Sequence, residues 1–282
     1  MNKVYLHYKR NISLLNIIIL LLFLFSIYGF YKNGIVLYSS GYTNLLMMFK
    51  PLYMLLISLG TSFLFSKIYK EKFVSFRLAG NLMITLCAMY NINLLVYLIL
   101  ILVVNGINKF IKFNVTGLFM VISIVLNMFL KNNTFANIME NSNIFNYSFL
   151  DYLLGKGVGG VGNTLLILSL ISYGILTCNN EYKKQIPTVF LITFYVLITI
   201  KSFITGNADV NLFINNNVIF GAIFMLPLSV YSPYFRGSIY VYGVLMAILT
   251  FLLSFIDINL AIYLVIFIGS VIYKFFDKIL VK

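Results

Sequence analysis

Ten apolar runs, separated by short polar stretches, constrain the fold of this chain more than any other feature. The chain is 61% hydrophobic and only 10% charged, whereas soluble domains are about 45–50% apolar and about 25% charged. Most of this apolar surface must therefore face lipid, where backbone groups bond within helices. No alternating barrel pattern is present. The sequence predicts an all-α polytopic membrane protein with ten transmembrane helices, at Ser13–Phe30, Leu45–Ser66, Leu78–Tyr90, Leu94–Ile111, Gly117–Leu130, Thr164–Thr177, Pro187–Ile204, Val218–Val230, Ile239–Phe255 and Leu260–Tyr273.

The basic residues predict how these helices are oriented. Fifteen of the 20 Lys and Arg residues fall at the two termini and in the second, fourth, sixth and eighth connections. The other five are on the opposite side, at Lys32, Lys50, Lys131, Lys156 and Lys201. By the positive-inside rule, both termini are cytoplasmic in a multi-pass protein of the cytoplasmic membrane. The net charge of +13 is thus explained by the lipid bilayer as partner, and nucleic-acid binding is not expected.

Cysteine and histidine are too scarce for several kinds of site. The chain has two cysteines, Cys87 and Cys178, each alone in an apolar run, and one histidine, His7. A Cys/His metal site is therefore not expected. A cysteine protease or a Ser-His-Asp hydrolase cannot be assembled inside the membrane without a second histidine.

The stretch GVGGVG at 157–162 fits the pattern G-x-G-x-x-G of nucleotide-binding loops. It lies on the predicted outer face, has no preceding strand and lacks a βαβ unit, so a dinucleotide site is excluded. Instead the glycines allow a tight turn or a close backbone approach, and Asn163 or Thr164 can cap the following helix. Exposed N–H groups there would suit a flavin phosphate. The alternative is a re-entrant turn that packs without a ligand. The candidate residues are Gly157, Gly159, Gly160, Gly162, Asn163 and Thr164.

The ten spans divide into two halves of five, 1–130 and 164–282, joined by an extracytoplasmic loop at 131–163 that contains the glycine turn. Because five is odd, the second half is inverted relative to the first. The third span of each half is short, and such segments in matching positions indicate a site near the midplane. The candidate residues there are Asn81, Thr85, Ser229 and Ser232. The alternative is that these polar residues only bond neighbouring helices.

Two stretches in the second half of the chain resemble the motifs of a known family. Gly155–Leu176, GKGVGGVGNTLLILSLISYGIL, resembles the segment G-S-L-G-E-T-S-x-L-x-x-L-x-G-G. Phe220–Gly237, FGAIFMLPLSVYSPYFRG, is similar to F-G-A-F-F-M-A-T-D-P-V-T-S-P-x-T-x-x-G. The residues that fit the second motif are Phe220, Gly221, Ala222, Phe224, Met225, Val230, Ser232, Pro233 and Gly237. Both motifs are those of the RnfD and NqrB family, and the chain resembles a divergent member of it. The resemblance implies ten spans in two inverted five-helix halves, in agreement with the count above.

The resemblance also implies a redox role. The family's proteins are membrane subunits of redox complexes that hold flavin and pass electrons across the membrane. One FMN is usually attached to a threonine of an S-G-A-T motif, which is missing here, since Thr134 lacks the preceding residues. The family Glu of G-E-T is Asn163, and the Asp-Pro of T-D-P-V is Leu228-Ser229. Covalent FMN is therefore not expected, and the cofactors implied are FMN or riboflavin held non-covalently, or a quinone.

Three functions follow as hypotheses. The leading one is a membrane subunit of an Rnf/Nqr-like or other flavin-based extracytoplasmic electron-transfer system, with flavoprotein or NADH dehydrogenase partner subunits, rather than a stand-alone enzyme. The second is a channel or carrier for a small polar solute, favoured by the inverted halves and the polar residues in the spans. The third is a structural scaffold for a partner subunit.

Overall fold

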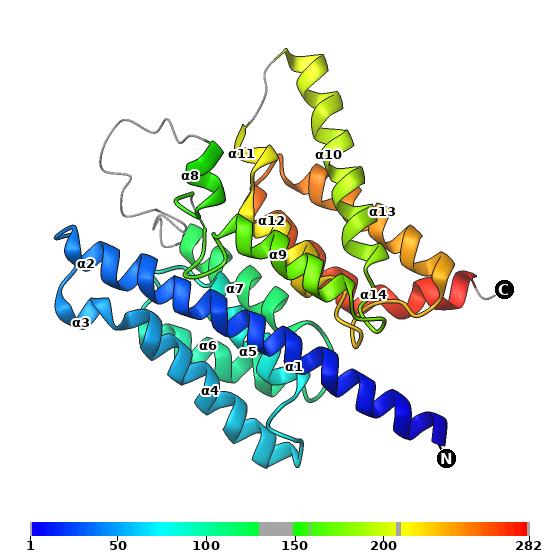
Figure 1. Cartoon of the computed structure of the whole chain (residues 1–282), viewed down its shortest axis with the longest axis horizontal. Coiled ribbons are helices and arrows are strands. Elements are labelled where there is room, and N and C mark those ends of the chain that lie inside the picture. The colour runs from blue at the N-terminus through cyan, green and yellow to red at the C-terminus, as the bar shows by residue number, and fades with distance from the viewer. Residues whose placement is uncertain (1, 130–148, 158, 207–209, 281–282) are drawn as a thin grey trace.

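The computed structural model describes residues 2–129, 149–157, 159–206 and 210–280, which are mostly helical with no strand among them (Figure 1). Most of the predicted loop 131–163, with Thr134 in it, lies outside the described residues. The helical content of the described residues confirms the predicted all-α fold class.

Five helical segments are long and apolar enough to cross a membrane, by length and composition. In the first, α1 continues without a break through a π-helical turn, η1, into α2, so that the apolar segment runs to Ser39. The five segments correspond to predicted spans 1, 2, 7, 9 and 10. Their helices are α1 (Asn2–Phe30), η1 (Tyr31–Val36), α2 (Leu37–Ser39), α4 (Lys50–Tyr69), α10 (Gln185–Thr205), α13 (Arg236–Leu253) and α14 (Ile258–Leu280).

The other five predicted spans form shorter apolar helices. Both third spans are short, as expected, because the first is followed by an extended turn and the second ends before Pro227. The second consists of a helical turn, α12, followed directly by a π-helical turn, η3. The helices are α5 (Phe76–Cys87), α6 (Leu94–Ile107), α7 (Val115–Phe129), α9 (Leu166–Thr177), α12 (Asn216–Phe220) and η3 (Gly221–Met225), and the minor helices between spans are α3 (Leu45–Met48), α8 (Phe149–Leu153) and α11 (Val210–Phe213).

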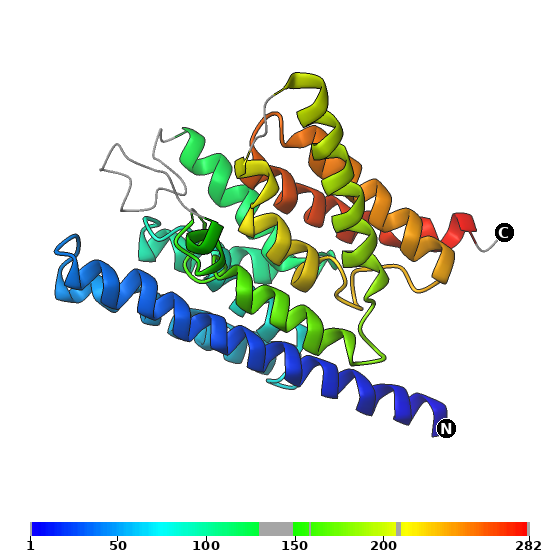
Figure 2. The ribbon, with the colours of Figure 1, turned by 45° about the horizontal axis from the view of Figure 1, so that its top comes forward.

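The connections alternate between two ends of the molecule, as the charge pattern predicts. At one end the connection after α9 contacts the loop after η3, where the Lys183 ammonium donates to Ser232. The N–H of Tyr234 in that loop donates to Asp277 near the end of α14. The start of α1 and the end of α14 lie at this side in two views (Figures 1 and 2). We call it the basic end and the other the outer end; the assignment of the basic end to the cytoplasm stays a prediction.

Helix pairing follows a similar order in the two parts of the chain. In the first part α4 packs against α5 and α6, and α7 packs against α5 and α6. In the second part α13 packs against α10 and α14, and α14 also contacts α12 and η3. Helices α7 and α14 pack against each other and join the two parts. The division at 1–130, 131–163 and 164–282 stays a prediction.

The first span departs from the expected boundary, and this matters for the site. The sequence predicts that the helix ends at Phe30 and that Lys32 lies in the loop, but the helix continues to Ser39. The π-helical turn η1 contains Lys32 and Asn33, and π turns are frequent at functional sites. Both side chains bond to the glycine stretch, which explains why polar residues are tolerated inside this segment.

Candidate functional site

The glycine turn packs between α1 and the C-terminal end of α5. The N–H of Val161 donates to the Ala88 carbonyl at 2.9 Å, and the N–H of Gly162 donates to the Leu86 carbonyl at 2.9 Å. A Cβ at Gly160 would stand 2.5 Å from the carbonyl oxygens of Leu86 and Cys87. Glycine is therefore required here by close backbone approach, which is one of the two roles predicted for this stretch.

Three N–H groups of this turn are used within the protein. The N–H of Gly160 donates to Asn163 Oδ1 at 2.8 Å, and those of Val161 and Gly162 bond to the end of α5. The expectation that Asn163 or Thr164 caps the next helix is wrong. Helix α9 begins at Leu166, its N-cap is Leu165, and no side chain caps it. Asn163 and Thr164 are instead fully buried and bond to other elements.

Asn163 anchors the glycine turn to the second part of the chain. Its amide nitrogen lies 2.6 Å from Asn217 Oδ1 on α12. The Asn217 amide nitrogen in turn lies 2.6 Å from Asn259 Oδ1 on α14, and the Tyr263 hydroxyl donates to Asn217 Oδ1 at 3.1 Å. We call Asn163, Asn217, Asn259 and Tyr263 the amide cluster. Buried amides that are hydrogen-bonded to one another fix the register of the segments they join.

Lys32 lies between the glycine turn and an open cavity at the outer end. Its ammonium group donates to the Gly157 carbonyl and to Thr164 Oγ1, both at 3.0 Å. The cavity has a volume of ≈ 540 Å³, within the usual range for ligand pockets of about 300–1,000 Å³. Its lining is formed by Tyr28, Tyr31, Lys32, Asn33, Val36, Leu37, Leu154, Lys156 and Leu165. We call this space the outer cavity.

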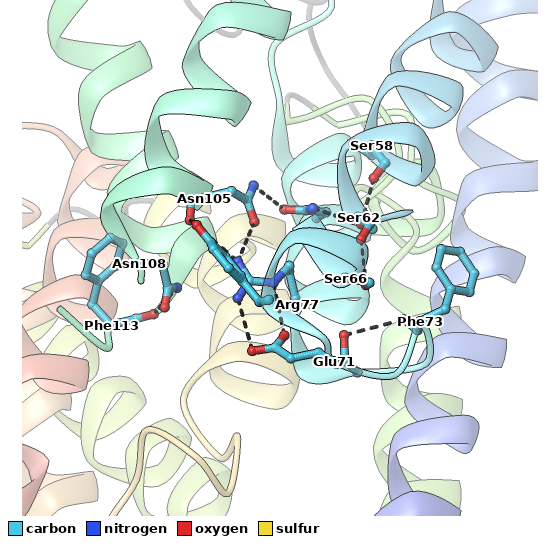
Figure 3. Close-up of polar contacts among 12 residues, drawn as sticks. Ser58, Ser62, Ser66, Glu71, Phe73, Arg77, Asn105, Asn108 and Phe113 are labelled. Atoms are coloured by element: carbon cyan, nitrogen blue, oxygen red, sulfur yellow. Dashed lines mark hydrogen bonds and ion pairs between the residues drawn. The ribbon is translucent and has the colours of Figure 1, made fainter. Parts of the chain in front are cut away.

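Asn81 and Thr85 belong to a buried chain of hydrogen bonds between α4, α5 and α6, which we call the polar seam. Figure 3 shows Ser58, Ser62 and Asn105 of this seam. The Asn105 amide donates to Asn81 Oδ1 at 2.9 Å, and the Asn81 amide donates to Ser62 Oγ at 2.8 Å. Further along, Ser58 Oγ bonds both Thr85 Oγ1 and the Tyr97 hydroxyl at 2.7 Å. The side chains satisfy one another, as expected of polar residues that join membrane helices.

Ser229 and Ser232 lie at the opposite end of the molecule, in the loop after η3. Lys183, in the connection before α10, holds this loop by donating to the Ser232 carbonyl at 2.9 Å and to Ser232 Oγ at 2.8 Å. Burial lowers the pKa of Lys183 to about 8, and the charge of Asp277 partly opposes that shift.

The predicted site residues thus fall into three separate places. The glycine turn, Asn163 and Thr164 are at the outer end, Asn81 and Thr85 are in the polar seam, and Ser229 and Ser232 are at the basic end. Thr85 comes nearest to the glycine turn, since it shares the lining of a small apolar cavity with Val161. Sequence reasoning missed Lys32 and the three other members of the amide cluster, Asn217, Asn259 and Tyr263. The apolar residues that resume after Lys32-Asn33-Gly34 were the available signal that the helix continues.

The fold and the site together define a multi-pass, α-helical membrane protein with a cation-lined cavity at its outer end. Within that class, the sequence matches the model of the NQR2, RnfD, RnfE family over residues 106–282, which is more than half of the chain. The chain therefore belongs to this family, and the family points to a membrane subunit of an Rnf/Nqr-type complex. A comparison with curated proteins finds none that matches.

Proposed function

We propose that this protein is an electron-relaying membrane subunit and that its outer cavity holds a flavin without a covalent bond. The observation that carries the proposal is the position of Lys32, a cation placed inside a membrane helix at the wall of a ligand-sized cavity. Ionisable residues within membrane segments are costly and are generally functional. Membership of the NQR2, RnfD, RnfE family supports a redox role.

The lining of the outer cavity fits a flat, polar-edged ring system. Tyr28 and Tyr31 supply aromatic surface, and Val36, Leu37 and Leu165 supply apolar wall. Asn33 is engaged with the Val161 carbonyl, so its amide helps to hold the wall in place. Ligand pockets generally combine such apolar walls with a few convergent polar groups.

Lys32 supplies the outer cavity with a hydrogen-bond donor and a positive charge. An ammonium group has three hydrogens, and in the described part of the chain two are directed at Gly157 and Thr164. The third remains for a ligand. When bound, a flavin supplies reversible electron transfer. The positive charge of Lys32 beside it would stabilise negative charge gained on reduction, and protein charge near the ring tunes the cofactor in this way.

Purification in a mild detergent tests the proposal. The wild type is expected to retain a flavin, identified by absorbance and by chromatography after extraction without protease. Lys32→Met should retain at least tenfold less. Lys50→Met is the matched control, because Lys50 is a lysine near the outer end that rests on the Tyr90 ring and does not line the cavity. A wild type that binds neither added FMN nor riboflavin, or a Lys32→Met protein that binds them as well as wild type, would refute the proposal.

A further inference from the structure

A second large cavity opens at the basic end and plays no part in the proposed redox role. Its volume is ≈ 590 Å³. It is bounded by the connection from α4 to α5, the connection from α6 to α7, and the loop after η3. Its lining is formed by Ile68, Tyr69, Lys70, Glu71, Ser75, Phe76, Arg77, Asn108, Lys109, Lys112, Val115, Val230 and Tyr231. We call it the basic cavity, and Figure 3 labels three of its lining residues, Arg77, Glu71 and Asn108.

The basic cavity carries an excess of positive charge. Among its described lining residues four are basic, Lys70, Arg77, Lys109 and Lys112, and one is acidic, Glu71. Glu71 is paired with Arg77 at 3.3 Å. The three lysines are therefore not neutralised by a carboxylate of the lining, and a cavity lined by one sign of charge concentrates ions of the other sign.

Arg77 is held in place before any ligand arrives. Its guanidinium group lies over the Tyr69 ring at 4.6 Å, and it donates to Asn105 Oδ1 at 3.4 Å, where the polar seam begins. The side chain is only 10% exposed. Its Nε and Nη2 donate to the Glu71 carboxylate and its Nη1 to Asn105, so Arg77 is a fixed part of the wall and the three lysines carry the excess charge.

Neutral polar side chains complete the lining, of which Ser75 and Asn108 donate to the carbonyls of Phe73 and Phe113. Ser75, Asn108 and Tyr231 all face the cavity. Burial raises the pKa of Tyr231 above its ordinary value, so the phenol keeps its proton and can donate to an anion.

The mouth of the cavity is bordered by exposed apolar side chains. Ile68 lines the cavity and is 63% exposed. Phe110 and Ile111 are 84% and 57% exposed, and they lie in the chain between the cavity residues Lys109 and Lys112. Apolar side chains flanked by lysines are typical of segments at the boundary between headgroups and acyl chains.

We propose that the basic cavity binds the phosphate group of an anionic phospholipid, whose acyl chains rest on Ile68, Phe110 and Ile111. Basic pockets between membrane helices recognise anionic headgroups through charge at short range. A soluble phosphate would meet the same cations, but it would gain nothing from the apolar border. The lipid should therefore bind more tightly than its headgroup alone.

Native mass spectrometry in a neutral detergent tests this. The full-length protein is titrated with phosphatidylglycerol, phosphatidylcholine or glycerol phosphate. We compare wild type with the double variant Lys109→Gln, Lys112→Gln. The control double variant, Lys274→Gln and Lys278→Gln, removes the same charge from exposed lysines of α14 that do not line the cavity. Phosphatidylglycerol binding should fall at least tenfold in the cavity variant and less than twofold in the control.

Three outcomes would overturn the proposal. One is equal loss of phosphatidylglycerol binding in both double variants, which would indicate a general charge effect. Another is binding of phosphatidylcholine as tight as that of phosphatidylglycerol. The third is glycerol phosphate competing as well as the whole lipid, which would assign the cavity to a soluble anion. Thermal melting of each variant shows whether a loss of binding reflects unfolding, and a charge-retaining Lys109→Arg, Lys112→Arg protein should restore binding.

Discussion

Replacing Gly160 by alanine should destabilise this protein strongly, because the added methyl group has no space. Its carbon would stand 2.5 Å from two backbone carbonyl oxygens, and real Cβ atoms essentially never approach closer than 3.0 Å. The turn would have to move by about 0.5 Å. Both hydrogen bonds from Val161 and Gly162 to the end of α5 would be weakened. Neither carbonyl can rotate away as a side chain could.

The expected cost follows from these contacts. Overpacking of a filled interior costs about 1–3 kcal/mol, and each of the two hydrogen bonds is worth about 0.5–1.5 kcal/mol. Together we expect a loss of about 2–6 kcal/mol. At roughly 2–4 °C per kcal/mol for a chain of this size, the melting temperature should fall by roughly 4–24 °C.

A thiol-reactive dye gives a direct assay. Cys178 is exposed and Cys87 is buried, so in a Cys178→Ser background the dye reports only on Cys87, whose carbonyl is one of the two obstructed groups. Gly174→Ala is the matched control, because a Cβ there meets nothing within 4 Å. In a helix interior, alanine should be neutral or stabilising by about 0.5–1 kcal/mol. Equal melting temperatures for Gly160→Ala and Gly174→Ala would refute the close-packing argument.

Two further predictions concern the polar seam and Lys183. Asn81→Ala removes two interhelical hydrogen bonds and should cost about 1–2 kcal/mol at ~0.6–1 kcal/mol per bond. Asn127→Ala, where the amide contacts the Met89 sulfur, should cost less; the reverse order of dye-detected melting temperatures would contradict the structural role of the seam. Burial lowers the folded-state pKa of Lys183 to about 8. Between that pH and the ordinary lysine pKa of about 10.4, the unfolded chain therefore binds more protons than the folded one. The contribution of Lys183 to stability should rise with pH across this window by at most about 1.4 kcal/mol per pH unit. Wild type should gain melting temperature relative to Lys183→Met between pH 8 and 10, and parallel pH profiles would contradict this.

Much of the fold could be predicted from the sequence, because an apolar run placed in a membrane must form a helix. Each of the ten apolar runs corresponds to a helix, and the connections alternate between two ends as the basic residues indicate. The polar residues Asn81 and Thr85 do gather with others near the third span, because neighbouring helices present amides and hydroxyls at the same depth.

The site was harder to predict because its contacts are remote in sequence. The glycine turn bonds to Leu86 and Ala88, more than 70 residues away, and to Asn217 on the other side. No local pattern reveals such partners. The position of Lys32 was also missed, since a lysine beside Asn-Gly ordinarily marks a loop. Here bonds to Gly157 and Thr164 compensate the charge, so the helix continues through it.

The amide cluster has a mechanical consequence. One short stretch, Gly160–Asn163, is bonded to α5 through its backbone and to α12 through the Asn163 amide. This stretch therefore fixes the two parts of the chain relative to each other. An alternating-access carrier opens by rocking one bundle against the other, and here such rocking would break these bonds together. Electron tunnelling between fixed centres requires no such motion. The hydrogen bonds that join Gly160–Asn163 to α5 and α12 are therefore compatible with electron relay and oppose transport by rocking.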